Sequence, residues 1–594
     1  MPNEAPPARG SLPASSLAGE ARHGTLTVVD ALQAIVHTEL LCARALWAPR
    51  LVDAVAHAFD ETVEWLGDDL DDANGALEAC DRAADSGART AALLSVSALA
   101  NARTALRRLV ERRRPVVIHA VVTPRGRDAT PTSYADVHAI ADLGAGVLLA
   151  RDAQDASDLV IIAHRAAEDA EAPIVVVHDG YPASYARDRV ILPDAPLVRA
   201  ALEPAPPPLA SSTEESLPGH RRAAARVPFA LASAMRTFER LSGRKTDALD
   251  AHHTAQAEIA IVAAGAIAET ARAVVEHARA QTPGLAVGLV QIVSLRPFPG
   301  AQLVKALARV RSIAVLDRID TPLAQSNPLA LEVKAAFADA LTWTPGYPGI
   351  GRIPEIFSGS VDPAAREATP ADLFAVLENL ALGEQGQRVF HLGGVHPRGH
   401  HLTPGADRAV HPDEAFALRW HADPALLVHL LGDLYRAHVR ATPRAHGPRD
   451  AYDVVVSPSP VRAHHGAHVL DVIALDSKSE LDPQLLDALR EGGALILLGG
   501  AADAALAKLP SAARAVLRAR NGRVFVAPEV TRIDAALLGA LLRARPPRGF
   551  DRARTIVDAE RSLRAASPPL REAEVRAMVE ATVRAIDTVV ELRP

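Results

Sequence analysis

The chain of 594 residues predicts an α/β protein, because short apolar strands alternate with helical segments along most of its length. Hydrophobic residues make up 49% of the sequence and aromatic residues only 4%, so Ala, Val and Leu must fill the core. Such small side chains suit helices packed on sheets. The length exceeds what one hydrophobic core supports. We therefore expect three consecutive domains with mostly parallel sheets, followed by a C-terminal helix.

Residues 24–192 form the first predicted unit, after a Pro-, Ala- and Ser-rich leader at 1–23 that is expected to be disordered. A helical pattern over 92–114 ends before Pro115. Three short apolar runs predict buried strands: 116–122, 146–149 and 174–177. Asp155 is expected to cap the helix between the last two strands. This order of elements predicts a parallel sheet with helices on its faces.

The second predicted unit, 246–382, follows a linker and connecting helix at 193–245 that contains PAPPPLASSTEES. Its expected strands are 259–263, 285–293 and 312–316. Its expected helices are the one that follows the first strand to about residue 279, then 301–309 and 370–382. This unit too is predicted to be an α/β layer structure.

The third predicted unit, 386–560, opens with a His-rich loop region and then alternates strands and helices. Its expected strands are 453–456, 469–475, 494–498 and 524–526, with helices at 483–490, 510–519 and 533–543. We expect a doubly wound parallel sheet. The segment 561–594 is assigned to a C-terminal helix, since 571–592 carries one apolar face.

Composition excludes several function classes. A net charge of −7 gives no basic footprint for nucleic acid, and no run of 18 apolar residues predicts a membrane span. The N-terminus lacks the pattern of a secretory signal, so a cytoplasmic protein is expected. The two cysteines, Cys42 and Cys80, lie in helical patterns and are expected to be core residues. Two thiols cannot supply the four ligands of an iron–sulfur cluster.

Two segments of the second unit, GLVQIVSLRPFP at 288–299 and SIAVLDRIDTPLAQSNPLALEVKAA at 312–336, resemble the middle domain of the pyruvate:ferredoxin (flavodoxin) oxidoreductase, or 2-oxoacid:acceptor oxidoreductase, family. The first unit, with RPVVIHAVV at 114–122, resembles that family's pyrimidine-binding domain. The third unit resembles its gamma domain. The resemblance implies a pyrimidine-binding-like, a transketolase C-terminal-like and a gamma-domain-like fold, in that order. The ferredoxin-like domain and the domain that grips the diphosphate of thiamine diphosphate are not matched.

The resemblance also implies three contacts to thiamine diphosphate and substrate, and this sequence departs from the pattern at each of them. The family's Glu falls at Ala73, with Asp72 one residue away as a weak substitute. Its substrate-binding Arg falls at Thr123, so Arg125 and Arg127 are the weak candidates for a carboxylate contact. Its Ile-Thr-Pro loop falls at 47–50, Trp-Ala-Pro-Arg, which has no Thr. We expect no confident catalytic residue on this chain.

A loop of the third unit, HLGGVHPRGHH at 391–401, falls where the family has a Gly-rich loop. Gly393 and Gly394 are weak candidates for close approach of the backbone to a phosphate. The histidines of this loop and of 464–468 are expected to be solvated and not metal ligands, because their spacing fits no standard zinc site. Asp317 and Arg318 are expected to form an ion pair at a strand end or to meet a neighbouring domain.

Two hypotheses follow. The first is a subunit that resembles the N-terminal part of a 2-oxoacid (pyruvate):ferredoxin oxidoreductase, at most one component of a multi-subunit complex and inactive alone. A second oxidoreductase subunit would then bring thiamine diphosphate and the iron–sulfur clusters, with no cofactor on this chain alone. The alternative is a non-catalytic relative, a pseudoenzyme that acts as a scaffold or regulatory binding protein. In either case an oligomer is expected, and the sequence leaves open the substrate, coenzyme A binding and the survival of any catalysis.

Overall fold

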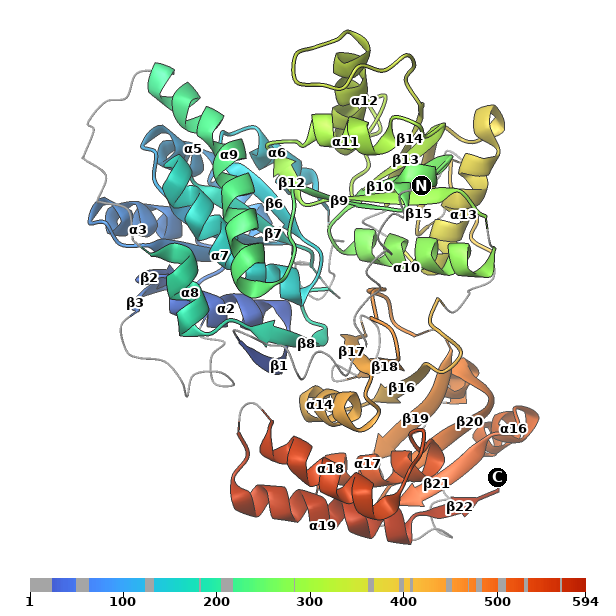
Figure 1. Cartoon of the computed structure of the whole chain (residues 1–594). Coiled ribbons are helices and arrows are strands. Elements are labelled where there is room, and N and C mark those ends of the chain that lie inside the picture. The colour runs from blue at the N-terminus through green and yellow to red at the C-terminus, as the bar shows by residue number, and fades with distance from the viewer. Residues whose placement is uncertain are drawn as a thin grey trace, which may run out of the picture.

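The computed structural model describes most of the chain. The described residues are 24–49, 63–122, 133–180, 183–203, 217–282, 284–361, 368–394, 400–405, 410–444, 451–467, 469–476, 483–499, 509–527, 532–566 and 569–593. Three sheets, each covered by helices on both faces, make up this part of the molecule (Figure 1). The predicted α/β class with mostly parallel sheets is confirmed.

The first sheet has seven strands in the order β12-β6-β7-β5-β4-β2-β3, all parallel except β12. Its strands are β2 (Ala45–Trp47), β3 (Glu64–Gly67), β4 (Thr90–Ser95), β5 (Val116–Val121), β6 (Gly146–Ala150), β7 (Ile174–His178) and β12 (Ser294–Arg296). One face is covered by α2 (Ala31–Cys42), α7 (Ala153–Ala170), α8 (Ala195–Leu202) and α9 (Leu217–Ser242). The other face is covered by α3 (Ala73–Asp85), α4 (Val96–Asn101), α5 (Arg103–Glu111) and α6 (Ala135–Ala141). Burial on both faces explains why these strands are almost wholly apolar.

The second sheet has six strands in the order β15-β14-β13-β10-β11-β9, of which only β9 runs antiparallel. Its strands are β9 (Leu249–His252), β10 (Ile259–Ala264), β11 (Val287–Ile292), β13 (Ser312–Asp317), β14 (Glu355–Val361) and β15 (Val389–Leu392). The helices α10 (Ala266–Gln281) and α13 (Pro370–Ala381) cover one face. The helices α11 (Gly300–Leu307) and α12 (Pro328–Leu341) cover the other face. Short 3₁₀ turns lie at η3 (Thr254–Gln256) and η4 (Gly383–Gln385).

The third sheet has nine strands in the order β1-β8-β17-β18-β16-β19-β20-β21-β22. Its strands are β1 (Thr25–Val29), β8 (Arg187–Leu192), β16 (Phe416–Trp420), β17 (His438–Pro443), β18 (Tyr452–Ser457), β19 (Leu470–Asp476), β20 (Leu489–Leu498), β21 (Arg523–Ala527) and β22 (Val590–Leu592). One face packs on α14 (Ala425–Leu434), α17 (Ile533–Ala544), α18 (Arg552–Arg564) and α19 (Glu572–Thr588). The other face packs on η5 (Pro483–Ala488) and α16 (Ser511–Ala519).

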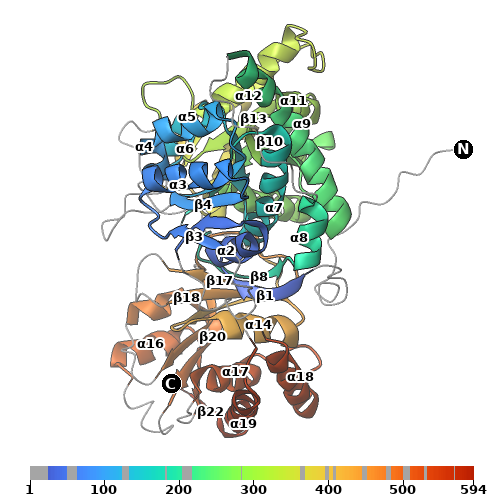
Figure 2. The same ribbon diagram turned by 90° about the vertical axis from the view of Figure 1, so that its left-hand side faces the viewer.

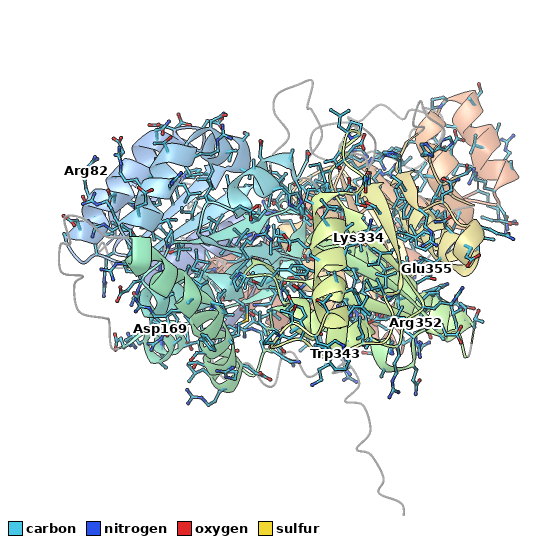
Figure 3. The ribbon with its side chains drawn as sticks, turned by 90° about the horizontal axis from the view of Figure 1, so that it is seen from above. Arg82, Asp169, Lys334, Trp343, Arg352 and Glu355 are labelled. Carbon is cyan, nitrogen blue, oxygen red and sulfur yellow. The ribbon has the colours of Figure 1, made fainter. Side chains whose placement is uncertain are left out.

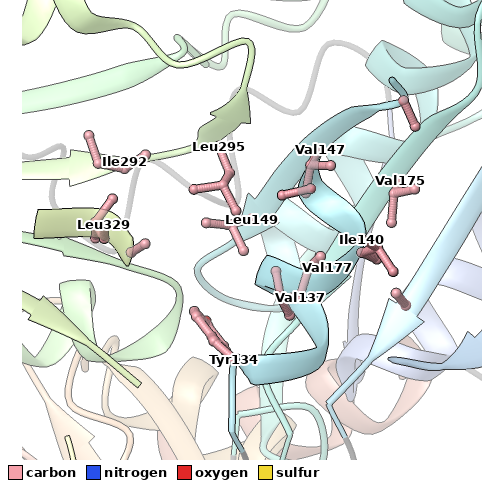
Figure 4. Close-up of a cluster of buried hydrophobic side chains, with 14 of the residues drawn as sticks. Tyr134, Val137, Ile140, Val147, Leu149, Val175, Val177, Ile292, Leu295 and Leu329 are labelled. Carbon is pink, nitrogen blue, oxygen red and sulfur yellow. The ribbon is translucent and has the colours of Figure 1, made fainter. Parts of the chain in front are cut away.

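Strands shared between segments tie the three sheets together. The β12 strand belongs to the sequence of the second unit but pairs with β6 of the first sheet. The strands β1 and β8 belong to the sequence of the first unit but extend the third sheet through β17 (Figure 2). One buried cluster also continues from β6 and β7 to β12 and the start of α12, with Leu149 beside Leu295 (Figure 4). The units are therefore joined by hydrogen bonds and by a common core.

Several sequence-based expectations about single elements are wrong. Residues 92–95 belong to β4 and not to a helix. A short apolar run is compatible with a buried strand and with a buried helix, so its pattern does not distinguish them. The cap of α7 is Asp152, whose Oδ1 accepts from the backbone N–H of Asp155 at 2.9 Å. Asp155 therefore lies at the third helical position.

The third sheet also departs from its prediction. It is mixed and not parallel throughout, since β18 runs antiparallel to β16 and β17, and β22 antiparallel to β21. The expected helix at 483–490 is a short 3₁₀ turn that leads into β20. The last helix ends at Thr588, after which the chain forms β22, and α18 had no counterpart in the prediction.

The opening of the third unit, expected to be loop-rich, instead contains β15, β16, α14 and β17, and β15 belongs to the second sheet. The strands predicted in the first two units are present within one or two residues, and both cysteines are buried and free. Within the described residues, no helix is both long and apolar enough to cross a membrane.

Candidate functional site

The position predicted for the family's Glu lies at the start of α3. Ala73 is 2% exposed, and its side chain offers no hydrogen-bonding group. Asp72 is exposed, and its Oδ1 accepts from the backbone N–H of Gly75 at 2.9 Å as the cap of this helix. The carboxylate is therefore turned onto its own helix, where it stabilises the N-terminus.

The position predicted for the Ile-Thr-Pro loop follows β2. The indole Nε1 of Trp47 donates to the carbonyl oxygen of Asp69 at 2.8 Å, and the Ala48 N–H donates to that of Gly67 at 3.0 Å. Ala48 is fully buried. The start of this segment is thus fixed by backbone contacts and presents no hydroxyl group.

Thr123, Arg125 and Arg127 lie outside the described residues. Their predicted role in binding a carboxylate stays a prediction.

Gly393 and Gly394 follow β15 at the edge of the second sheet, and Gly393 has a φ of 92°. The chain returns beside this strand, since the His391 N–H donates to the His400 carbonyl oxygen at 2.7 Å and the Leu402 N–H to that of His391 at 3.1 Å. His396 and His468 lie outside the described residues. His391 and His464 are buried, so the expectation that these histidines are solvated is wrong for both. Within the described part of the chain no three His, Cys, Asp or Glu side chains are grouped to hold a metal ion. The phosphate role of the two glycines stays a prediction.

A buried acid lies instead in the core of the first unit. Glu39 of α2 accepts from His119 Nε2 at 2.6 Å and from His164 Nε2 at 2.8 Å, and all three side chains are inaccessible to solvent. Burial alone would raise the pKa of Glu39, but His164 and His119 outweigh it and lower the pKa to about 2. Both oxygens of this carboxylate accept hydrogen bonds from histidines, so Glu39 has a structural role and is not available to exchange a proton with a ligand.

The cluster continues from His119 to the end of β7. His119 Nδ1 lies 3.1 Å from His178 Nε2, and burial together with His119 lowers the pKa of His178 well below its usual range. His178 is therefore neutral. The next residue, Asp179, begins the contact with the second unit.

The carboxyl ends of β7 and β13 meet at the junction of the first two units. Asp179 Oδ2 accepts from the backbone N–H of Ala266 at 2.6 Å, so a side chain of the first unit caps α10 of the second. Arg318 Nε lies 3.7 Å from Asp179 Oδ1. Arg318 thus meets the first unit, which is the less favoured of the two sequence-based interpretations of Asp317-Arg318.

Asp317, the last residue of β13, also takes part in this junction. Its Oδ2 accepts from the Leu329 N–H at 3.0 Å at the start of α12, and His138 Nε2 of the first unit lies 3.1 Å from the same oxygen. The Tyr134 N–H donates to the Arg318 carbonyl oxygen at 2.8 Å. Burial, with Asp179 nearby, raises the pKa of the Tyr134 hydroxyl well above its usual range. The hydroxyl therefore stays protonated.

The third unit joins the same region through α10. Arg462 Nη1 donates to Glu269 Oε2 at 2.9 Å, and Gln291 Nε2 donates to Glu269 Oε1 at 2.7 Å. Arg151, at the end of β6, donates to the Gln291 side-chain oxygen at 3.1 Å. Burial alone would raise the pKa of Glu269, but the charges of Arg462 and Arg151 have the larger effect. The pKa of Glu269 is therefore lowered. In the third sheet, Arg440 Nε of β17 donates to Asp188 Oδ1 of β8 at 2.7 Å.

This junction is a frame of paired ions and capped helices. Ligands of α/β proteins bind outside the carboxyl ends of the strands, which is where the junction lies. The carboxylates of Asp179, Asp317 and Glu269 each accept hydrogen bonds from groups of another element. The arrangement can fix the three units relative to one another. Sequence reasoning missed Glu39 and Glu269; Glu39 is the one acidic residue of the otherwise apolar α2, whereas Glu269 is one of several charged residues of α10 and gives no such signal.

Comparisons with known proteins match the two units that form this junction. Residues 257–351 match the family described as pyruvate:ferredoxin oxidoreductase core domain II. Residues 69–220 match the family described as pyruvate flavodoxin/ferredoxin oxidoreductase, thiamine diphosphate-binding. The two matched segments are therefore similar to two domains of the pyruvate:ferredoxin oxidoreductase family, and the first of them resembles a domain described as thiamine diphosphate-binding.

Individual relatives agree with this assignment. A pyruvate-flavodoxin oxidoreductase of Klebsiella pneumoniae is 30% identical over 271 residues, which are 42% of this chain and 22% of the relative. One of Trichormus variabilis is 26% identical over 294 residues, which are 45% of this chain and 24% of the relative. The matches thus span less than a quarter of the length of each relative. A solved structure, the 2-oxoglutarate:ferredoxin oxidoreductase of Magnetococcus marinus, is similar with a TM-score of 0.41 and 15% identity, covering 60% of this chain and 65% of that one.

Proposed function

We propose that this chain is a frame subunit of a 2-oxoacid:acceptor oxidoreductase-type assembly and is inactive alone. It holds pyrimidine-binding-like, transketolase C-terminal-like and gamma-like units in a fixed arrangement. A partner chain supplies thiamine diphosphate and the iron–sulfur clusters. The proposal keeps the cytoplasmic location that the sequence predicts.

The observation that carries the proposal is the start of α3. The family's aminopyrimidine contact needs a side-chain acid in a dry site, because a neutral side chain cannot drive the required tautomer. Ala73 has no such group, and the Asp72 carboxylate is exposed and occupied as a helix cap. The described residues at this position do not fit the cofactor, so no catalytic step is assigned to them.

The buried ions support the same proposal. Glu39 is a fully buried carboxylate in the first unit, but two imidazoles hold both of its oxygens. The chain has two cysteines, both buried, whereas a cluster needs four thiolates. In contrast, ion pairs join the units: Arg318 with Asp179, Arg462 with Glu269 and Arg440 with Asp188.

A titration of the purified chain tests the proposal. Thiamine diphosphate with Mg²⁺ is added in a calorimeter, and reduction of a viologen dye by pyruvate is followed in parallel. We expect neither saturable heat nor dye reduction from the chain alone. Saturable binding together with pyruvate-dependent reduction by this chain alone would overturn the proposal.

The second candidate is a non-catalytic relative that acts as a scaffold or regulatory protein without any cluster-bearing partner. The loss of the acid at Ala73 favours it as much as it favours a subunit. The two candidates differ in the partner. A co-purifying chain rich in clustered cysteines supports the first, and its absence from native cells supports the second.

A further inference from the structure

Arginine side chains gather at the amino edge of the third sheet, where β20 and β21 begin and where α16, α17 and β22 end. The members of this arginine patch are Arg490, Arg520, Arg523, Arg543, Arg545 and Arg593. Of these, Arg490, Arg543 and Arg593 are exposed and the other three are partly exposed. Figures 1 and 2 show α16 and the C-terminus on the same side of the third unit.

Two members of the patch share one carboxylate. Arg490 Nη1 lies 2.6 Å from Asp471 Oδ1, and Arg545 Nη2 lies 2.8 Å from the same oxygen. The other oxygen, Asp471 Oδ2, accepts from the backbone N–H of Ala417 at 2.9 Å. A single buried carboxylate thus faces two guanidinium groups, and its one negative charge cannot neutralise both.

The other members of the patch adjoin these two. Arg523 Nη2 donates to the carbonyl oxygen of Ala544, the last residue of α17, at 3.1 Å. Arg520 Nη1 donates to the carbonyl oxygen of Leu489, the first residue of β20. The antiparallel register of β21 and β22 brings Arg593 beside the start of β21. The arginines therefore form one patch, although they come from different elements.

Few carboxylates adjoin the patch. The acids next to these strand starts are Asp471, Asp487 and Glu491, half as many as the arginines. Among the residues that the structure describes, Arg490 and Arg545 are the members that form an ion pair. The patch therefore carries a net positive charge, whereas the chain as a whole carries −7.

Arginines on the neighbouring helices of the same unit are paired with acids. On α18 and α19, Arg552 Nη2 lies 2.5 Å from Asp587 Oδ2, and Arg564 Nη1 lies 2.6 Å from Glu572 Oε2. Exposed pairs of this kind contribute little to stability, but they leave a surface without net charge. The excess of positive charge is thus a property of the patch and not of the arginine content of the unit.

Charges of both signs also mix on the first two units. Figure 3 looks onto these units from above and labels acids as well as cations, among them Asp169 and Glu355. Asp169 Oδ2 lies 2.9 Å from Arg165 Nε, and Glu355 Oε1 lies 2.9 Å from Arg388 Nη2. The arginine patch differs from this surface in having too few acids for its cations.

Aromatic rings hold two guanidinium groups of the patch in place. Arg523 Cζ lies 5.2 Å from the centroid of the Phe525 ring, and Arg545 Cζ lies 5.3 Å from that of Phe416. A guanidinium has five N–H donors, and Arg523 uses one of them on Ala544. Side chains positioned in this way lose little conformational entropy when they bind a carboxylate, which favours an interface.

We propose that the arginine patch is a docking surface for an acidic protein. Arginine binds carboxylates through paired N–H groups and is enriched at protein interfaces. A second copy of this chain does not fit, because a two-fold axis would bring arginines opposite arginines. A nucleic acid fits less well, since it would approach a chain with a net charge of −7. The patch lies on this chain alone, so its test is separate from that of the frame-subunit proposal.

Fluorescence anisotropy of a labelled poly-L-glutamate peptide, titrated with the full chain, tests the proposal. We expect saturable binding at low salt that weakens as salt is added, because the attraction is between exposed charges. Arg543→Glu/Arg593→Glu should raise the dissociation constant at least about tenfold, because repulsion replaces attraction at two positions. Both side chains are exposed, so the substitutions should leave the fold intact, which circular dichroism checks.

A matched variant controls for the change in total charge. Arg554→Glu/Arg561→Glu removes two arginines of α18 whose side chains are 71% and 75% exposed, and it should leave the dissociation constant unchanged. An equal loss of binding in this control would overturn the proposal, because the patch would then have no special role. Absence of saturable binding to the wild type would overturn it as well.

Two further measurements separate the acidic protein from other occupants of the patch. A duplex DNA oligonucleotide is titrated in parallel, and tighter binding of DNA that is lost in Arg543→Glu/Arg593→Glu would overturn the proposal in favour of a nucleic acid. Sedimentation velocity of the wild type and the same variant follows self-association. Association that only the variant loses would overturn the proposal in favour of a second copy of the chain.

Discussion

Two helices of the second sheet, α10 and α12, begin alike and are used differently. Each follows a parallel strand, and each has its N-terminus capped by a carboxylate at a strand end, Asp179 for Ala266 and Asp317 for Leu329. In both cases the capping group also contacts a cation-forming side chain, Arg318 or His138. The local physics of the two helix starts is therefore the same.

The outer surfaces of the two helices differ. The third unit reaches α10, where Arg462 binds Glu269 and the His464 N–H donates to Thr270 Oγ1 at 3.3 Å. In contrast, Leu331 on α12 is 48% exposed and Leu341 is 38% exposed. The third unit of the chain thus covers α10, whereas Leu331 on α12 has no such cover among the described residues.

The largest expected effect is at Gly265, where α10 begins. Its φ is +67°, and a Cβ there would lie 2.6 Å from Asp179 Oδ2 and closer still to the Tyr134 hydroxyl. Gly265→Ala should lower the free energy of unfolding by about 3 to 5 kcal/mol, since strain and a buried clash add. The midpoint of urea unfolding, followed by circular dichroism, measures it.

A matched glycine controls for backbone strain. Gly284 has a φ of +90° but no neighbour within 4 Å of an added Cβ. Gly284→Ala should therefore cost only about 1 kcal/mol. Equal losses for the two variants would show that the contact between the first two units does not stabilise the chain.

The second prediction compares the loss of charge at the two capping carboxylates, Asp179 and Asp317. Asp179→Asn should cost about 2 to 3 kcal/mol, because it removes the charge that faces both the α10 terminus and buried Arg318. It should also increase proteolysis between the first two units. Asp317→Asn should weaken the start of α12 with less effect on the unit junction. Limited proteolysis of both variants tests this order, and the reverse order would contradict it.

The third prediction concerns the decrease in the free energy of unfolding at acidic pH. Burial, with His465, Arg440 and His277 nearby, lowers the pKa of His411 to about 4, and burial with Arg440 lowers that of His464 well below its usual range. The unfolded chain thus binds more protons below pH 6.5, so stability falls as the pH drops from about 6.5 toward 4. At pH 5 we expect a loss of about 1 to 2 kcal/mol from His411.

The unfolding midpoint between pH 7 and pH 5 measures this loss. His411→Gln should flatten the profile, because the residue no longer titrates. Buried carboxylates such as Glu39, with a pKa of about 2, lose their contribution only at lower pH. A profile with unchanged slope in His411→Gln would exclude this histidine as the source.

The smallest effect is on the outer face of α12. Leu331→Gln should change the free energy of unfolding of the monomer by less than about 0.5 kcal/mol, since the side chain is half exposed. On the inner face of the same helix, Phe337→Ala should cost about 3 to 5 kcal/mol. A large loss in Leu331→Gln would mean that this face is covered within the chain.

Much of the fold could be predicted from the sequence, because the spacing of apolar residues and the β-branched residue types indicate which segments are buried strands or helices. The run 116–122 is apolar apart from His119, and it forms the central strand β5. The pattern failed where two elements bury the same residue types, as at 92–95. It also failed where pairing partners lie far away in sequence, since nothing local shows that β8 joins β17.

The candidate site was less predictable than the fold. The positions of Ala73 and Asp72 follow from resemblance, but the use of Asp72 as a helix cap is a property of local backbone geometry. The junction of Asp179 with α10 joins residues 87 positions apart and could not be read from spacing. The roles of Arg125 and Arg127 remain sequence-based predictions.

The most direct test of the frame-subunit account is purification of the tagged chain from its native cells, with an absorbance spectrum and thiamine analysis of what comes with it. The account predicts a second protein, the visible absorption of iron–sulfur clusters, and thiamine diphosphate that is lost when the two chains are separated. Recovery of the chain without such a partner, in a form that binds thiamine diphosphate and oxidises a 2-oxoacid by itself, would contradict it.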